Sequence, residues 1–389
     1  MAPKIAIAVA IAAELAFLAP PGAEASFSHR QEGKMERAVE GWKHEMHYPG
    51  LEAGLWQKGV GSFRTTVGVA NRDTSRPLGF ADHFQVGSIT KTFTATLVLQ
   101  LVERGKLSLD DPVSRYVGIV PHGDEITIRE LLDMTSGLHT YPNDLMEDIV
   151  GHPHHNWRPL ELVRRSVAAP RHCAIAEVGT ESCEYYTNTN YILLGLIIKR
   201  VTDQPLRKLY ERRIFKPLGM DDTIFNPRSH AVPKPIAHGY IRDPDSGQVV
   251  DTTRWNLSYA WTAGGARSTL SDLRRWARAL ATGRGVLGKR MQRTRLQFVP
   301  IPGTNGVNAY GLGIFEIETG GDLRRFSPLL GHDGQMFGYD SFILYSPRQR
   351  LAIAALGNTS TSQNPVRRSP ADSESMPLLS GKLLKAIAP

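Results

Sequence analysis

A serine and a lysine three residues apart give the first indication of chemistry in this sequence. Ser88 and Lys91 form its only S-x-x-K pattern. A free serine hydroxyl is a poor nucleophile at neutral pH, and a neighbouring lysine can activate it. Apolar residues recur at Ile89, Phe93 and Leu97, which predicts a buried helix that begins beside Ser88 and places Lys91 one turn away. The alternative is a helix-capping serine beside an ordinary surface lysine.

A Y-x-N pattern supplies a second candidate group. Tyr186 and Asn188 precede the apolar run 191–198, so they are predicted to lie at the entry of a buried helix. A tyrosine close to Lys91 should have a lowered pKa, so it could take the serine proton and pass it to the leaving group. The Asn188 amide could bind Lys91 or a substrate carbonyl. The alternative is a structural tyrosine with a capping asparagine.

The second Y-x-N copy, Tyr141-Pro142-Asn143, has no such helix after it, and its proline predicts a surface loop.

An H-x-G pattern supplies the third group. His332, Asp333 and Gly334 precede a turn at Gly338 and a predicted strand. A glycine at a strand edge allows a substrate backbone to approach closely. The backbone N–H of Gln335, together with that of Ser88, could form an oxyanion hole. Taken alone, His332 would more often be a packed or surface histidine.

These three motifs, in this order, resemble the serine β-lactamase and DD-peptidase family, particularly the class C β-lactamases and the related D-alanyl-D-alanine carboxypeptidases and esterases. The resemblance runs from about residue 84 to residue 358. It implies that Ser88 is the acylated nucleophile, Lys91 its activator and Tyr186 the general base. It also implies that Asn188 binds the lysine and the substrate, and that His332 replaces a lysine found in many members. Further similar stretches are 105–113, 127–132, 135–138, 217–220 and 264–265.

The resemblance implies an α+β fold, in which an antiparallel sheet is flanked by helices and carries an inserted all-helical region. The hydrophobic pattern agrees, because strand signals cluster near the two ends of the chain while the middle, about 88–280, is mostly helical. A polar stretch over 359–375 is predicted to be a surface loop. The predicted end elements are a helix at 34–47, strands at 51–57, 63–70, 310–318, 341–346 and 351–356, and a last helix through 378–384.

Asp333 departs from the family pattern and divides the functional hypotheses. Carboxypeptidase-like members usually carry Thr or Ser there to hold the substrate carboxylate, which Asp333 would repel. The first hypothesis is a D-alanyl-D-alanine carboxypeptidase acting on peptidoglycan peptides. The second is an esterase or D-aminopeptidase whose substrate end is cationic or uncharged. The third is a β-lactamase, with β-lactams as covalent ligands. A non-catalytic wall-binding module is disfavoured because all the catalytic residue types are present.

We expect no cofactor and no metal. The histidine-rich stretch at 152–155 ends in Asn156 and Trp157, so it lacks the Asp and the final His of the H-x-H-x-D-H zinc pattern.

The composition restricts location and partners. The 389-residue chain has a formal net charge of +8, but its basic residues fall in scattered pairs without a basic stripe, which argues against nucleic acid as a partner. Residues 1–25 read as a signal peptide that precedes a single hydrolase domain over 26–389. No stretch is long enough to span a membrane. The mature protein is therefore predicted to be exported, either periplasmic or secreted.

Cys173 and Cys183 are the only cysteines, and in an oxidising compartment they should form a disulfide. Such a bridge could stabilise the fold by about 2–3 kcal/mol. Thiol titration of the exported, unreduced and unfolded protein should therefore detect no free thiol. Two titratable thiols would exclude the bridge.

Overall fold

The computed structural model describes residues 26–141, 143–168, 186–229, 231–242, 246–301, 308–360 and 375–388. Three sequence predictions fall wholly or mostly outside these residues. They are the signal peptide over 1–25, the Cys173–Cys183 disulfide and the surface loop at 359–375.

The helices of the described residues are α1 (His29–Glu45), α2 (Ile89–Glu103), α3 (Ile128–Leu132), α4 (Asn143–Gly151), α5 (Pro159–Val167), α6 (Asn188–Thr202), α7 (Leu206–Tyr210), α8 (Lys216–Leu218), α9 (Trp261–Gly264), α10 (Leu270–Thr282), α11 (Lys289–Arg295) and α12 (Ser375–Ile387). The strands are β1 (Gly50–Gln57), β2 (Gly61–Asn71), β3 (Arg76–Pro77), β4 (Phe84–Gln85), β5 (Ile224–Phe225), β6 (Tyr240–Arg242), β7 (Val249–Asp251), β8 (Ala266–Ser268), β9 (Val299–Pro300), β10 (Asn308–Gly311), β11 (Ile314–Ile317), β12 (Leu329–Met336), β13 (Tyr339–Ser346) and β14 (Leu351–Gly357).

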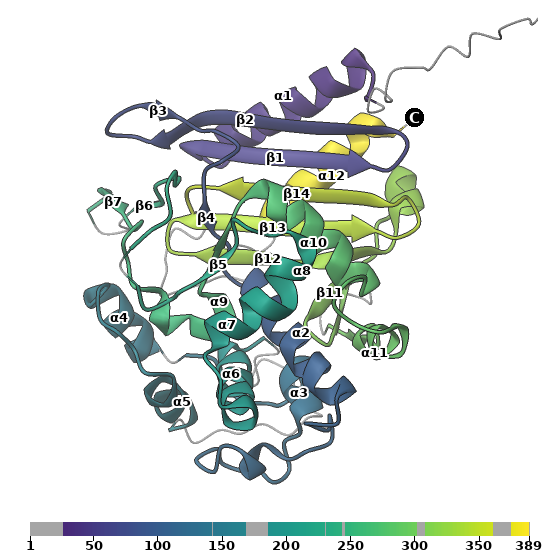
Figure 1. Ribbon diagram of the computed structural model, residues 1–389. Coiled ribbons are helices and arrows are strands. Elements are labelled where there is room, and N and C mark those ends of the chain that lie inside the picture. Colours follow the sequence, from purple (N-terminus) through teal and green to yellow (C-terminus); the bar gives the residue numbers. More distant parts are fainter. Residues whose placement is uncertain are drawn as a thin grey trace, which may run out of the picture.

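One large antiparallel sheet joins the two ends of the chain. Its nine strands run in the order β3-β2-β1-β14-β13-β12-β11-β10-β9. The N-terminal strand β1 pairs with the C-terminal strand β14, with Leu51 opposite Gly357. The helical region between them lies below the sheet in Figure 1. The predicted α+β fold, with a shared sheet and an inserted helical region, is confirmed.

Helices cover both faces of this sheet. On one face, α1 and α12 enclose a core to which α1 contributes Met35, Val39 and Trp42. These residues recur every three to four positions, as an amphipathic helix requires. A capping box between Ser28 and Gln31 fixes the start of α1. On the opposite face, α10 packs across β12, β13, β14 and β1 and buries Trp276 completely.

Helix α2 lies in the region below the sheet in Figure 1 and packs against α6, α9 and β12. The sequence predicts one buried stripe, but every residue from Ile89 to Leu101 is buried. A helix that is enclosed on all sides is held in a fixed position by its neighbours. The residues at its N-terminus are therefore held rigidly relative to the sheet.

Several elements differ from the sequence predictions. The predicted strand at 310–318 is the hairpin of β10 and β11, which reverses at Gly313 with a φ of 77°. Strand β12 was not among the predicted strands, and the mostly helical middle also contains β5 to β8. The surface prediction is wrong for Tyr141, since its side chain is buried and its hydroxyl donates to the carbonyl oxygen of Tyr259 at 2.6 Å.

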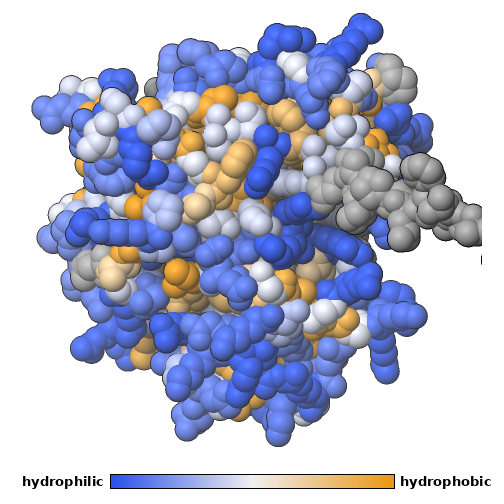
Figure 2. Space-filling view, turned by 45° about the horizontal axis from the view of Figure 1, so that its top comes forward, coloured by the Kyte–Doolittle hydropathy of each residue, from blue (hydrophilic) through white to orange (hydrophobic). Residues whose placement is uncertain are grey.

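The surface is largely hydrophilic, with small apolar patches between polar side chains on the face shown in Figure 2. Among the described residues, no helix combines the length and the apolar character that crossing a membrane requires.

A buried carboxyl group on β1 makes stability depend on pH. Glu52 is fully buried, and within the described residues neither of its carboxyl oxygens has a hydrogen-bond partner. Burial, followed by the nearby Asp82 carboxylate, raises the pKa of Glu52 well above its ordinary value of 4.5, against a smaller lowering by Arg64. The folded protein therefore binds this proton more tightly than the unfolded chain does.

Replacing Glu52 with glutamine should remove a pH-dependent destabilisation. The free energy of unfolding of the native sequence should fall as the pH rises from 4.5 towards the raised pKa, by up to about 1.4 kcal/mol per pH unit. The Glu52→Gln variant should lack this slope. In urea unfolding experiments, its free energy of unfolding relative to that of the native protein should therefore rise with pH. The exposed Glu36→Gln change serves as the control. Parallel slopes for Glu52→Gln and the native protein would contradict this account.

Candidate active site

The predicted nucleophile and its lysine are in contact. Ser88 immediately precedes α2 and makes no side-chain capping bond. Lys91 Nζ lies 2.9 Å from Ser88 Oγ. Lys91 is completely buried, so it is not the surface lysine of the alternative interpretation.

The Lys91 ammonium group joins three helices. Besides Ser88, its Nζ donates to Asn188 Oδ1 at 2.7 Å and to the carbonyl oxygen of Ala263 in α9 at 3.0 Å. It also lies 4.9 Å from the centre of the Tyr186 ring, within range of a cation–π interaction. A buried ammonium ion is tolerated only where such acceptors replace its hydration. The predicted contact between Asn188 and Lys91 is thus present.

Local hydrogen bonds hold the Y-x-N segment at the start of α6. Thr187 caps this helix, and its hydroxyl also donates to the carbonyl oxygen of His139 at 3.0 Å. The backbone N–H of Asn188 donates to Thr140 Oγ1 at 3.3 Å. Tyr186 and Asn188 therefore reach Lys91 from a segment fixed at both the helix and the preceding loop.

Strand β12 presents an open edge beside the nucleophile. It pairs with β13 from Leu330 to Met336, but with β11 only from Leu329 to Gly331. Residues 332–336 therefore have no strand partner on the β11 side within the described residues. An unpaired strand edge can bind an extended substrate through backbone hydrogen bonds.

Two glycines allow β12 to approach the nucleophile segment closely. A Cβ atom on Gly334 would lie 2.1 Å from the carbonyl oxygen of Val86 and 3.0 Å from the Ser88 nitrogen. A Cβ atom on Gly87, whose φ is 49°, would lie 2.6 Å from the Gln335 nitrogen. Any larger residue would push the segments apart. This proximity brings the backbone N–H groups of Ser88 and Gln335, the two predicted oxyanion donors, into neighbouring positions.

His332 lies within an aromatic cluster. Its side chain is buried, and its Nε2 is 2.9 Å from the Tyr310 hydroxyl. Its Nδ1 is 2.6 Å from the carbonyl oxygen of Asp333. The centre of the Phe315 ring lies 4.8 Å from that of the His332 ring. The Phe315 ring also stacks against the Tyr186 ring, with 6.5 Å between the ring centres. The imidazole is therefore held on the Tyr186 side of the site.

Sequence reasoning missed three contributors to the site. Tyr310 and Phe315 belong to the hairpin that was predicted as one strand, so their common orientation was not evident. The Ala263 carbonyl oxygen has no side-chain signature; the only available signal was the neighbouring pair Gly264-Gly265, noted as similar to the family.

Asp333 is the acidic residue of the site. Its side chain is 29% exposed, whereas that of His332 is fully buried. One carboxyl oxygen lies 3.4 Å from His332 Nδ1. Gln335, two residues further along β12, is likewise partly exposed. Asp333 and Gln335 therefore share the accessible side of the strand, since side chains alternate along a strand.

The histidine-rich stretch lies elsewhere, in the loop between α4 and α5. His155 packs edge-on against Trp157, with ring centres 4.6 Å apart. In the described part of the chain, no group of three or more His, Cys, Asp or Glu side chains is arranged to hold a metal ion.

Comparisons with known proteins identify the family of the chain. The family model described as Beta-lactamase matches residues 34–374. The chain therefore belongs to the beta-lactamase family of serine hydrolases, which act on acyl substrates such as amides and β-lactams.

Two solved structures and one curated relative illustrate the similarity. The D-stereospecific amidohydrolase from Streptomyces sp. has a TM-score of 0.76 and 29% identity, covering 91% of this chain and 98% of that one. The D-amino acid amidase from Ochrobactrum anthropi SV3, complexed with L-phenylalanine amide, has a TM-score of 0.75 and 26% identity, with coverages of 92% and 98%. Protein flp of Staphylococcus aureus (strain N315) is 28% identical over 343 residues, which cover 85% of this chain. The match spans only 64% of the length of Protein flp.

Replacing Lys91 with methionine should reduce hydrolysis of an activated aryl ester by about 10²- to 10⁴-fold, because the ammonium group beside Ser88 is lost. Methionine has a similar length and is apolar, so the fold should persist, as thermal unfolding would verify. Lys199→Met, at an exposed position of α6, is the matched control and should retain full activity. Equal activities for the two variants would remove Lys91 from the mechanism.

Proposed function

We propose that this protein hydrolyses amides of D-amino acids that carry a free α-ammonium group, through an acyl-enzyme on Ser88. This function corresponds to the D-aminopeptidase predicted as one alternative from the sequence. The observation that carries it is the partly exposed Asp333 carboxylate on the open edge of β12. A carboxylate there favours a cationic substrate end over an anionic one. The names of the two similar structures, both covered almost completely, support amide hydrolysis of D-configured substrates.

The proposed reaction begins with proton transfer from Ser88 Oγ to Tyr186, whose ionised form the nearby Lys91 ammonium group favours. Ser88 Oγ then attacks the amide carbonyl, and the N–H groups of Ser88 and Gln335 stabilise the oxyanion. Tyr186 returns the proton to the leaving nitrogen as the C–N bond breaks. Water then attacks the ester by the same proton path, which releases the acid and restores Ser88.

A D-alanyl-D-alanine carboxypeptidase is the second candidate. It is favoured by the H-x-G motif with its buried His332, which the resemblance associates with that branch. The Asp333 carboxylate disfavours it, because that enzyme must bind a substrate carboxylate. Release of D-alanine from a D-alanyl-D-alanine peptide at a rate matching D-amino acid amides would favour this candidate.

We further propose that the protein is exported and acts in the periplasm or outside the cell. The proposal rests on the signal-peptide pattern of residues 1–25. A periplasmic or secreted location would bring the site into contact with cell-wall peptides.

Replacing Asp333 with threonine should lower kcat/KM for a D-amino acid amide by about fivefold, the value of a partly exposed ion pair. The N-acetylated amide lacks the ammonium group, so its kcat/KM should not fall. Asp322→Asn, an exposed carboxylate change elsewhere, should alter neither substrate. If Asp333→Thr affects both substrates equally, Asp333 does not recognise the ammonium group.

A further inference from the structure

A basic pocket lies at the end of α2 opposite to Ser88. It has a volume of about 390 Å³. Arg104 directly follows the last residue of α2, whereas Ser88 directly precedes the first. Because Ser88 and Arg104 flank the 15 residues of α2, the two sites are separated by about 24 Å along the helix. The pocket is lined by Gln100, Arg104, Arg212, Arg213, Pro217, Gly285 and Val286.

The positive charge of this pocket is not neutralised locally. Within the described residues, none of Arg104, Arg212 and Arg213 forms an ion pair with a carboxylate. The two adjacent acids are directed to other groups. Glu103 accepts the Gly288 N–H at 2.9 Å, and Glu211 lies 3.5 Å from Arg207. Three arginines without a carboxylate partner among the described residues therefore line one opening, an arrangement that favours an anion.

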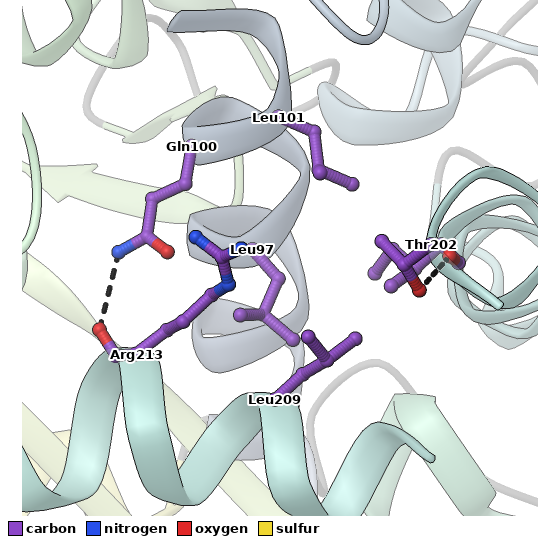
Figure 3. Close-up of a pocket in the computed structure, with 7 residues that line it drawn as sticks. Leu97, Gln100, Leu101, Thr202, Leu209 and Arg213 are labelled. Atoms are coloured by element: carbon purple, nitrogen blue, oxygen red, sulfur yellow. Dashed lines mark hydrogen bonds between the residues drawn. The ribbon is translucent and has the colours of Figure 1, made fainter. Parts of the chain in front are cut away.

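A buried amide also faces this pocket. Gln100 is only 6% exposed, and its Nε2 donates to the carbonyl oxygens of Arg213 and Val286 at 3.2 and 2.9 Å. These bonds fix the amide orientation, and its Oε1 has no partner within the described residues. The Gln100 and Arg213 side chains also line a second, neighbouring pocket with Leu97, Leu101 and Leu209, which is the one drawn in Figure 3. The buried Nε of Arg213 likewise lacks a partner within the described residues. Both atoms are enclosed by the protein, where lacking a partner is unfavourable.

An irregular helical turn carries two of the arginines. Between α7 and α8 the chain forms a π-helical turn, η3 (Glu211–Phe215), which contains Arg212 and Arg213. Isolated π turns within α-helices are uncommon and occur frequently at functional sites. The Arg212 side chain is further positioned by donation to Gln204 Oε1 at 2.7 Å.

We propose that this pocket binds a small phosphate ester. Arginine forks match the planar pairs of phosphate oxygens and can donate two hydrogen bonds to each pair. This site does not depend on the proposed amide hydrolysis, since it shares no residue with the catalytic cluster.

The proposal can be tested by calorimetric titration of the full chain with glycerol 3-phosphate, with potassium chloride at matched ionic strength as the reference. Binding should saturate at one equivalent. Arg213→Gln should weaken it at least about tenfold, the effect of losing one charge-assisted hydrogen bond. Arg278→Gln, an exposed arginine of α10 with no ion pair in the described residues, should leave the affinity unchanged. Aryl ester hydrolysis should persist in both variants and verify that they are folded.

Arg212→Gln, at an exposed position, should also weaken binding and provides a second variant if Arg213→Gln fails to fold. Titration with inorganic phosphate and with glycerophosphoglycerol distinguishes the possible sources of the bound phosphate group. Preference for the diester would indicate a phosphodiester polymer, and preference for the monoester a free metabolite. Non-saturable binding, or equal loss in Arg213→Gln and Arg278→Gln, would overturn the proposal by leaving only non-specific ion attraction.

Discussion

The buried ammonium group of Lys91 is the constraint on which the rest of the site depends. Removing such a charge from water costs several kcal/mol unless hydrogen-bond acceptors compensate. Ser88, Asn188 and the Ala263 carbonyl oxygen provide acceptors from three different parts of the chain. The same contacts that stabilise the charge therefore fix the nucleophile, α6 and α9 relative to one another. Folding and the proposed reaction both require these acceptors to stay in place, because a displaced acceptor would leave the charge uncompensated and would also move the serine.

The sheet adds the second half of the site. Pairing of β1 with β14 brings the two ends of the chain together, and β12 lies two strands beyond β14. The shorter pairing between β11 and β12 leaves 332–336 open, and Gly87 and Gly334 permit the contact with the start of α2. A rigid, fully enclosed helix thus meets an unpaired strand edge. That arrangement suits a reaction in which a fixed nucleophile attacks an extended substrate.

The contact between Ser88 and Lys91 could be predicted from the sequence because short-range helix geometry relates the two residues directly. Asn188 was predicted from its motif, although 97 residues separate it from Lys91. The Ala263 contact could not be predicted, since every residue has a backbone carbonyl and only tertiary packing selects this one. Tyr310 was missed because a single glycine, Gly313, turns an apparently continuous strand into a hairpin. The outer elements were predicted well because their alternating or helical hydrophobic patterns reflect one buried face.

The central claim is that Ser88 becomes acylated. Its most direct test is the intact mass of the protein after acid quenching during incubation with benzylpenicillin and, in parallel, with a D-amino acid aryl ester, followed by peptide mapping. The account predicts a single covalent adduct on the peptide containing Ser88, and no adduct in Ser88→Ala. An adduct that persists in Ser88→Ala, or hydrolysis of the aryl ester that survives this substitution, would contradict it.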